Sequence, residues 1–324
     1  MSQNLRVRKN IRPRQRQEPS RGSAGRRRQG KIMFLMILPF LVLNFLFSYF
    51  PLHGWIYAFF DYRAPLRLSQ TEFVGFKWFT MLFSNATQIS QLAQVMLNTF
   101  AMSLLGIATS VLPLIFAIFL SEIQNGPFRK TVQTLTTLPN FISWVLVYSV
   151  AFSLFSNSGM VNSVLQQLGL IARPVKFLDS DDHTWLFMLL WSQWKSLGWN
   201  AIMYLAAITG IDPGLYEAAR IDGAGRFRLM FHITLPSLLP TFFVLLMLSI
   251  ANFLNNGMDQ YYVFQNSFNK THIQVLDLYV YNIGLTGRSF SMATAIGIMK
   301  SVVSVVLLTI VNVTSKRVRG ESII

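Results

Sequence analysis

EAARIDGAGRFRLMFHITLP, residues 217–236, predicts a short helix, a glycine break, a second short helix and a proline that begins the next apolar run. Asp212-Pro213 before it is typical of a helix start, because the carboxylate can cap free backbone N–H groups and proline suits the first helical position. Gly223 can adopt the left-handed conformation that reverses the chain. The segment contains three arginines, and long apolar runs flank it. We therefore expect a folded loop in water between two membrane spans.

The composition of the whole chain favours a membrane protein. Of its 324 residues, 52% are hydrophobic and 13% are charged, whereas soluble domains carry about 25% charged residues. About 20 apolar residues are needed to cross the bilayer core. We predict an all-α membrane protein with six transmembrane helices, at roughly 32–58, 96–120, 135–155, 185–209, 237–257 and 290–314.

Much of the net charge of +15 lies at the amino terminus. Residues 1–31 contain eleven Lys or Arg and one Glu among many Gln, Ser, Gly and Pro, so we predict a disordered basic tail. If this tail is inside, 19 of the 28 Lys and Arg fall in cytoplasmic segments and seven in outer loops. This bias is the one that the positive-inside rule describes. We therefore predict that both termini and the 212–236 loop are cytoplasmic, and we assign no nucleic acid partner.

The 217–236 segment resembles the EAA loop of ABC importer permeases. Glu217-Ala218-Ala219, a glycine four residues later, and Ile233-x-Leu235-Pro236 ten residues after that glycine occupy the anchor positions. From about residue 97 to 316 the chain looks like a carbohydrate-type permease of the MalF and LplB-like polysaccharide branch, alginate importer permeases included. The segments that carry this wider resemblance include 194–199, 211–217, 257–260 and 291–297.

The resemblance implies the type I ABC importer permease fold, in which the EAA loop forms coupling helices that dock on an ATPase subunit. It also implies two such ATPase subunits, a second homologous permease, a periplasmic or extracellular solute-binding protein, and location in the bacterial inner membrane. ATP and Mg would be bound by the ATPase subunits, and no cofactor by this chain. The residues to which we assign ATPase coupling are Glu217, Ala218, Ala219, Asp222, Gly223, Phe227, Leu229, Phe231, Leu235 and Pro236.

These inferences divide the chain into four parts. Residues 1–31 form the basic tail, and residues 32–95 hold the first span and an outer loop with a short interfacial helix near 73–79. The permease core of five spans occupies residues 96–315, and residues 316–324 form a cytoplasmic C-terminal tail.

Two lysines inside the predicted spans are candidate substrate-pathway residues. Lys195 and Lys300 lie near the middle of spans four and six, where a charge costs at least about 2.5 kcal/mol to insert and usually faces a wet cavity or the bundle interior. No acid lies at that depth in the sequence, so both lysines are expected to lack an acidic partner in this chain. Trp191 and Trp199 lie four residues either side of Lys195 and should share its face. The alternative is structural, with these lysines bonded to carbonyls or to acids of a partner permease.

Span five adds a polar face to the same candidate pathway. Asn252, Asn255, Asn256 and Asp259 recur at helical spacing toward its outer end. Polar faces of this kind line translocation pathways, so we include the four residues with the two lysines.

Catalytic and metal chemistry are not indicated. Cysteine is absent, the four histidines are scattered, and the acidic cluster at 179–182 is best read as a solvated loop. A Gly-x4-Gly-Lys pattern at 25–31 lacks the Ser or Thr and the preceding strand that a phosphate-binding loop needs. We predict a transport subunit that is not an enzyme.

The unpaired lysines lead us to expect an importer of acidic, uronate-containing oligosaccharides such as alginate fragments, working by alternating access. A permease for neutral oligosaccharides is the first alternative. An ion-coupled secondary transporter is a weaker one, because such proteins need acids or broken helices at the membrane midplane, and the spans contain no acid.

Overall fold

The computed structural model describes residues 23–319 of the chain. Regular structure in this range is helical, and its one β-type contact is an isolated bridge between Phe60 and Phe73. The prediction of an all-α membrane protein is confirmed. The chain divides into two compact units at Gly54.

The first unit contains the helix α1, a π turn and the beginning of a 3₁₀ segment: α1 (Ser23–Asn44), η1 (Phe45–Tyr49) and η2 (Phe50–Phe59). Side chains from Lys31 to Phe50 are exposed, as apolar groups that face lipid would be. The helix begins at Ser23, so residues 23–31 belong to it and not to a disordered tail. Residues 1–22 lie outside the described range.

The second unit holds all the remaining helices, with π turns at η5 and η6. They are η3 (Leu68–Gln70), α2 (Lys77–Met81), α3 (Ala86–Ala108), α4 (Val111–Ser121), α5 (Gly126–Thr137), η4 (Leu138–Phe141), α6 (Trp144–Phe155), α7 (Met160–Gln167), α8 (Thr184–Thr209), α9 (Pro213–Ile221), α10 (Arg226–Leu229), η5 (Met230–Thr234), α11 (Leu235–Ala251), α12 (Asp259–Phe264), α13 (Lys270–Ile273), α14 (Leu276–Tyr281), η6 (Asn282–Thr286) and α15 (Phe290–Arg319).

Five helical stretches among the described residues are long and apolar enough to cross a membrane: Gln29–Phe59, Ala86–Ser121, Trp144–Gln167, Arg226–Ala251 and Phe290–Arg317. The other predicted span corresponds to α8, whose 26 residues also suffice in length. The polar residues Gln193, Lys195 and Asn200 interrupt the apolar sequence of α8.

Several predicted boundaries were wrong because local breaks interrupt the apolar runs. The predicted span 135–155 is split, since η4 contains Pro139 and α6 starts afresh at Trp144 after the N-cap Ser143. The predicted span 237–257 ends at Ala251. The helix expected near 73–79 begins at Lys77. The C-terminal helix continues to Arg319, so the first four residues of the predicted tail 316–324 are helical, while 320–324 lie outside the described range.

The loop before α3 packs with the C-terminal helix of the second unit. The Ser291 hydroxyl donates to the Phe60 carbonyl at 2.7 Å and accepts the Tyr62 N–H at 3.0 Å. The indole of Trp78 donates to the same carbonyl at 3.1 Å. Residues 55–95, which we grouped with the first span, therefore lie in one compact unit with the permease core.

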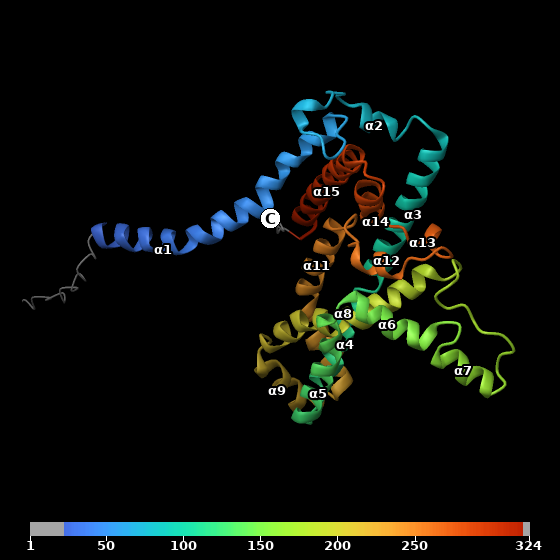
Figure 1. Cartoon of the computed structure of the whole chain (residues 1–324). Coiled ribbons are helices and arrows are strands. Elements are labelled where there is room, and N and C mark those ends of the chain that lie inside the picture. The colour runs from blue at the N-terminus through green and yellow to red at the C-terminus, as the bar shows by residue number, and fades with distance from the viewer. Residues whose placement is uncertain (1–22, 320–324) are drawn as a thin grey trace, which may run out of the picture. The chain divides into compact units, whose positions relative to one another are not determined.

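The helix α8 is central to the second unit. It packs against α3, α4, α5, η4 and α11, and Figure 1 shows α4, α5 and α8 side by side. Around α8, a buried cluster contains Leu114, Ala117, Ala201, Tyr204 and Leu238. This arrangement gives α8 one face against α4 and α5 and another toward α11.

Gly198 sets the closest approach between α8 and α5. A Cβ atom at this position would lie 2.3 Å from the backbone carbonyl oxygen of Thr136. Because a backbone atom cannot move aside as a side chain can, only glycine fits at this crossing.

We expect Gly198→Ala to separate α5 from α8 and to destabilise the protein by about 1–3 kcal/mol, the usual effect of overpacking. Gly297→Ala on α15 is the matched control, because a Cβ there meets nothing within 4 Å. The measurement is the midpoint of thermal unfolding of the purified protein in detergent. Equal midpoints for the two variants would contradict the close approach.

Candidate functional site

The loop at 212–236 folds as two short helices about a glycine. The Asp212 side chain accepts the Gly214 N–H at 2.9 Å, and Pro213 opens α9. Gly223 has φ +77°, and the N–H of Ala224 returns to the Ala219 carbonyl at 2.9 Å. The predicted helix, glycine reversal and second helix are confirmed. We call residues 212–236 the hairpin.

The hairpin presents an exposed apolar surface beside its charges. Ile221, Phe227 and Phe231 are 87%, 69% and 61% exposed. Phe227 and Phe231 lie one helical turn apart and so share a face. Apolar side chains of this size are rarely left open to water in a group unless another protein or a membrane covers them.

Not every residue assigned to coupling lies on that surface. Leu229 is only 4% exposed, and its neighbour Met230 packs into the cluster with Leu114 and Tyr204. Leu229 was therefore wrongly predicted as a docking contact, because this part of the hairpin turns inward. The other residues are exposed or half-buried: Glu217, Ala218, Asp222, Gly223, Phe227, Phe231 and Pro236 are exposed, and Ala219 and Leu235 are half-buried.

Lys195 is held by backbone carbonyls. Its ammonium donates to the carbonyls of Asn140 at 2.7 Å and Pro139 at 3.3 Å, and it lies 5.4 Å from the centre of the Trp144 ring. The side chain is 9% exposed. This geometry fits the structural alternative for Lys195, and its assignment to a substrate pathway stays a prediction.

The two indoles expected beside Lys195 pack elsewhere. The ring of Trp199 lies edge-on to Phe141 at 5.6 Å, and Trp191 packs against Phe155 at 6.0 Å and Phe264 at 6.1 Å. Helical spacing places both indoles near Lys195 in the sequence. In the folded chain, however, the ring beside the ammonium is that of Trp144, which comes from another helix.

Lys300 also has a partner, which the sequence did not reveal. Its ammonium pairs with the Asp277 carboxylate, and both side chains are mostly buried. The other oxygen of Asp277 accepts the Gly257 N–H at 3.0 Å. The expectation that neither lysine has an acidic partner was therefore wrong for Lys300. Burial and then the nearby Asp277 charge raise the pKa of Tyr261 on α12.

The polar face predicted on span five is not helical. After Ala251 the chain leaves the helix, and Gly257 takes φ +77° before α12 begins at Asp259. The Asn256 amide donates to the Ser103 hydroxyl at 3.0 Å, and Asp259 is exposed. Asn255 lines a cavity of about 470 Å³ together with Asp277 and Lys300. The four residues therefore lie in different environments and do not form one polar face.

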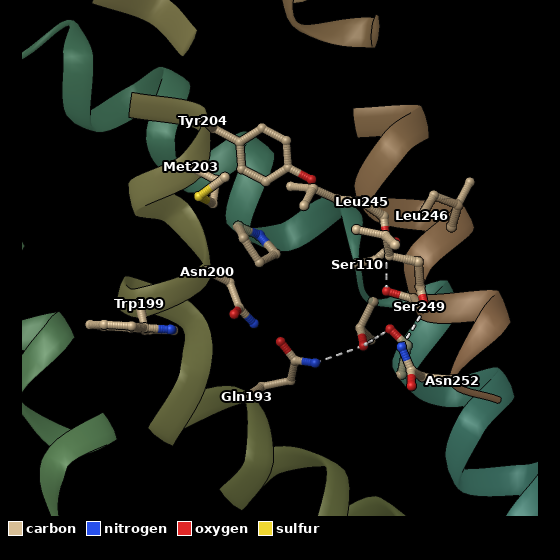
Figure 2. Close-up of a pocket in the computed structure, with 14 residues that line it drawn as sticks. Ser110, Gln193, Trp199, Asn200, Met203, Tyr204, Leu245, Leu246, Ser249 and Asn252 are labelled. Atoms are coloured by element: carbon tan, nitrogen blue, oxygen red, sulfur yellow. Dashed lines mark hydrogen bonds between the residues drawn. The ribbon is translucent and has the colours of Figure 1, made fainter. Parts of the chain in front are cut away.

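Asn252 lines a second cavity, of about 380 Å³, between α3, α4, α8 and α11. Its polar lining comes from Thr109, Ser110, Gln193, Asn200, Tyr204, Ser249 and Asn252, and Trp199 contributes at the margin. Figure 2 shows Gln193 and Asn200 pointing into the space that faces Ser249 and Asn252. We call this space the bundle cavity. It has no ionisable side chain except Tyr204 among its lining residues.

Gln193, one of the residues that line the bundle cavity, has a buried acceptor without a partner. Its amide nitrogen donates to the Thr109 hydroxyl at 2.8 Å, while its carbonyl oxygen is buried without a hydrogen-bond partner. An unpaired buried acceptor is unfavourable, so a small rotation of this amide that brings its oxygen to the cavity would let a donor pair with it. Sequence reasoning missed Gln193 and Asn200; the signal was their position among apolar residues within a span.

Metal ligands do not gather in the part of the chain that the structure describes, where no group of three His or acidic side chains could hold an ion. The nearest approach is the pair His272 and Asp181, at 2.9 Å between Nδ1 and Oδ2. This pair joins two loops that we predict on the outer side.

The ion pair at Lys300 allows a stability test. Lys300→Met leaves the Asp277 carboxylate without its cation, so we expect destabilisation of up to about 3 kcal/mol. The double variant Lys300→Met/Asp277→Asn should recover most of this loss, because no unpaired charge remains. The exposed Lys270→Met is the control. Thermal unfolding midpoints measure all three, and a double variant as unstable as Lys300→Met would refute the pairing.

Two solved transporter structures contain chains that are similar to this one. One is the crystal structure of a bacterial ABC transporter involved in the import of the acidic polysaccharide alginate, with 31% identity and a TM-score of 0.79 over 91% of this chain and 99% of that chain. The other is a bacterial alginate ABC transporter in complex with an alginate pentasaccharide-bound periplasmic protein, with 31% identity and a TM-score of 0.80 over 93% of this chain and 99% of that chain.

Sequence relatives agree with these structures. Protein LplB of Bacillus subtilis (strain 168) is 35% identical over 91% of this chain and 92% of its own length. The polygalacturonan/rhamnogalacturonan transport system permease protein YteP of the same organism is 38% identical over 91% of each chain. Residues 110–320 match the family model of the binding-protein-dependent transport system inner membrane component. The chain belongs to this family of ABC transporter permeases and is a transport subunit, not an enzyme.

Proposed function

We propose that this permease imports acidic, uronate-containing oligosaccharides and that the bundle cavity is part of their route. The observation that carries the proposal is the joint similarity to the alginate importer chains and to YteP, named for polygalacturonan and rhamnogalacturonan transport. The chemistry of the cavity is compatible, since its amides and hydroxyls can donate to and accept from sugar hydroxyl groups.

Recognition of the acid group in this chain would rely on neutral donors. Lys195 is occupied by the Asn140 and Pro139 carbonyls, and Lys300 by Asp277. Amide N–H and hydroxyl groups hydrogen-bond carboxylates without a full positive charge. The uncharged lining also favours a second candidate, import of neutral oligosaccharides, which the experiment below separates from the first.

The hairpin is the proposed docking site for an ATPase subunit. Two ATPase subunits would bind ATP and Mg, and this chain would bind neither. Exposed Phe227, Phe231 and Ile221 provide apolar contact for a groove, and Glu217 provides an exposed charge beside them. Closure of the ATPase subunits would then move the hairpin and open the bundle cavity alternately to each side of the membrane.

The proposed importer includes two further kinds of partner protein. A second homologous permease would complete the route, and a solute-binding protein would deliver the sugar on the outer side, as the periplasmic protein in the alginate complex suggests. The location is the bacterial inner membrane with both termini in the cytoplasm. The excess of Lys and Arg in the segments assigned to the inside supports this orientation.

Gln193→Glu tests the substrate class, because at a pH high enough to ionise the new, partly buried carboxyl it adds a negative charge to the bundle cavity with little change in shape. Uptake of uronate oligomers should fall on the order of tenfold more than uptake of neutral oligomers of equal length, since each 1.4 kcal/mol of repulsion is a factor of ten. Complexes reconstituted in vesicles with internal ATP, with the binding protein saturated, provide the measurement.

Two controls belong to this experiment. Gln124→Glu places the same charge at an exposed site outside the cavity and should leave both rates unchanged. Vesicles without ATP should show no accumulation. Normal uronate uptake by Gln193→Glu would show that the bundle cavity is not part of the transport route. Transport of neutral oligomers alone by the native protein would favour the second candidate function, import of neutral oligosaccharides.

A further inference from the structure

One side-chain hydrogen bond joins the two arms of the hairpin. The hydroxyls of Tyr216 on α9 and Thr234 at the end of η5 lie 3.0 Å apart. Among the side-chain hydrogen bonds of residues 23–319 it alone links α9 to the second arm. Tyr216 is half-buried, whereas Thr234 is 1% exposed. The bond therefore connects an outer arm to a fixed point inside the protein.

Thr234 lies where the hairpin becomes a membrane helix. It ends the π turn η5 (Met230–Thr234) and directly precedes Leu235, the first residue of α11. Further along, α11 contributes Leu245 and Ser249 to the bundle cavity. At 1.5 Å per residue, about 22 Å of helix separates Thr234 from Ser249. A displacement of Thr234 along the helix axis would thus reach the cavity through a single helix, which contains Pro240 in its second turn.

The backbone that connects α9 to α11 contains two points at which it can bend. The chain passes through Gly223, whose φ of +77° few other residues adopt readily. It then crosses the single-turn π segment, a kind of helix irregularity that is often found at functional sites. Neither of these points prevents α9 from rotating against the base of α11.

We propose that Tyr216 is the positioning residue that makes the hairpin and α11 move together, by way of its hydroxyl contact with Thr234. The inference rests on the proposed docking of an ATPase subunit to the hairpin. Without the contact, a push on α9 is absorbed at the glycine and at the π turn, and ATP hydrolysis continues without a matching movement of the cavity.

Removal of one hydroxyl tests this role with the ring left in place. In reconstituted complexes, Tyr216→Phe and Thr234→Val should each raise the number of ATP molecules hydrolysed per sugar transported by about fivefold, as expected for loss of one hydrogen bond. The double variant should be no worse than either single one, because both remove the same bond. Thr234→Ser keeps a hydroxyl and should stay near the native ratio.

A merely structural role predicts different results. Tyr216→Phe would then lower complex assembly or the unfolding temperature while the complexes that form keep the native ATP-to-sugar ratio. That outcome, or additive effects in the double variant, would overturn the proposal. Glu217→Lys separates it from the docking proposal, because a lost charge anchor should reduce binding of the ATPase subunit itself. Normal ATPase binding and coupling in Glu217→Lys would refute the proposal that the hairpin is the docking site. A native ATP-to-sugar ratio in Tyr216→Phe, with docking intact, would refute only the role proposed for Tyr216.

Discussion

The requirement that polar groups in an apolar bundle find partners within the protein governs the core of this structure. Pro139 breaks the segment between α5 and α6. Its carbonyl accepts the Ile142 N–H at 3.2 Å, and it and the Asn140 carbonyl can each accept a further donor. Lys195 on α8 supplies this donor, and its own charge is balanced by the same oxygens and by the Trp144 ring. Neither the break nor the buried lysine is favourable alone in a membrane. Together they fix α8 against η4, and Gly198, three residues further on, allows the close crossing with α5.

The same requirement explains which features were predictable from the sequence. The hairpin follows local rules: Asp212 caps its own helix, and Gly223 reverses the chain within a few residues. The fates of Lys195 and Lys300 depend on oxygens that are 55 and 23 residues away in sequence. Periodicity placed Trp191 and Trp199 beside Lys195, but helical spacing cannot say which neighbour will lie across the interface. Asn252, Asn255 and Asn256 have helical spacing, but α11 ends at Ala251, and the turn that follows is held in part by the Asp277 carboxylate, which accepts the Gly257 N–H from 20 residues further along the chain.

Satisfied lysines change the chemistry that this chain offers to a substrate. A free ammonium would attract any anion, whereas amides and hydroxyls discriminate by position and hydrogen-bond direction. The bundle cavity contains Gln193, whose nitrogen is engaged by Thr109 and whose oxygen is free. If the bundle cavity is part of the proposed route, its lining would contact a sugar through neutral hydrogen-bonding groups.

Internal hydrogen bonds also determine which parts of a membrane protein move as one body. The helix α11 carries cavity residues toward one end, and the buried Thr234 directly precedes its other end, so a single helix that contains Pro240 connects the two. The proposed docking surface on α9 lacks that continuity, since Gly223 and the π turn lie between. A single pair of hydroxyls at 3.0 Å bridges this gap. In the proposed coupling, α11 transmits movement from the hairpin to the cavity, and the apolar pattern of the sequence predicts this helix. The connection of α11 to α9 depends on the contact between Tyr216 and Thr234, which no pattern along the chain could indicate.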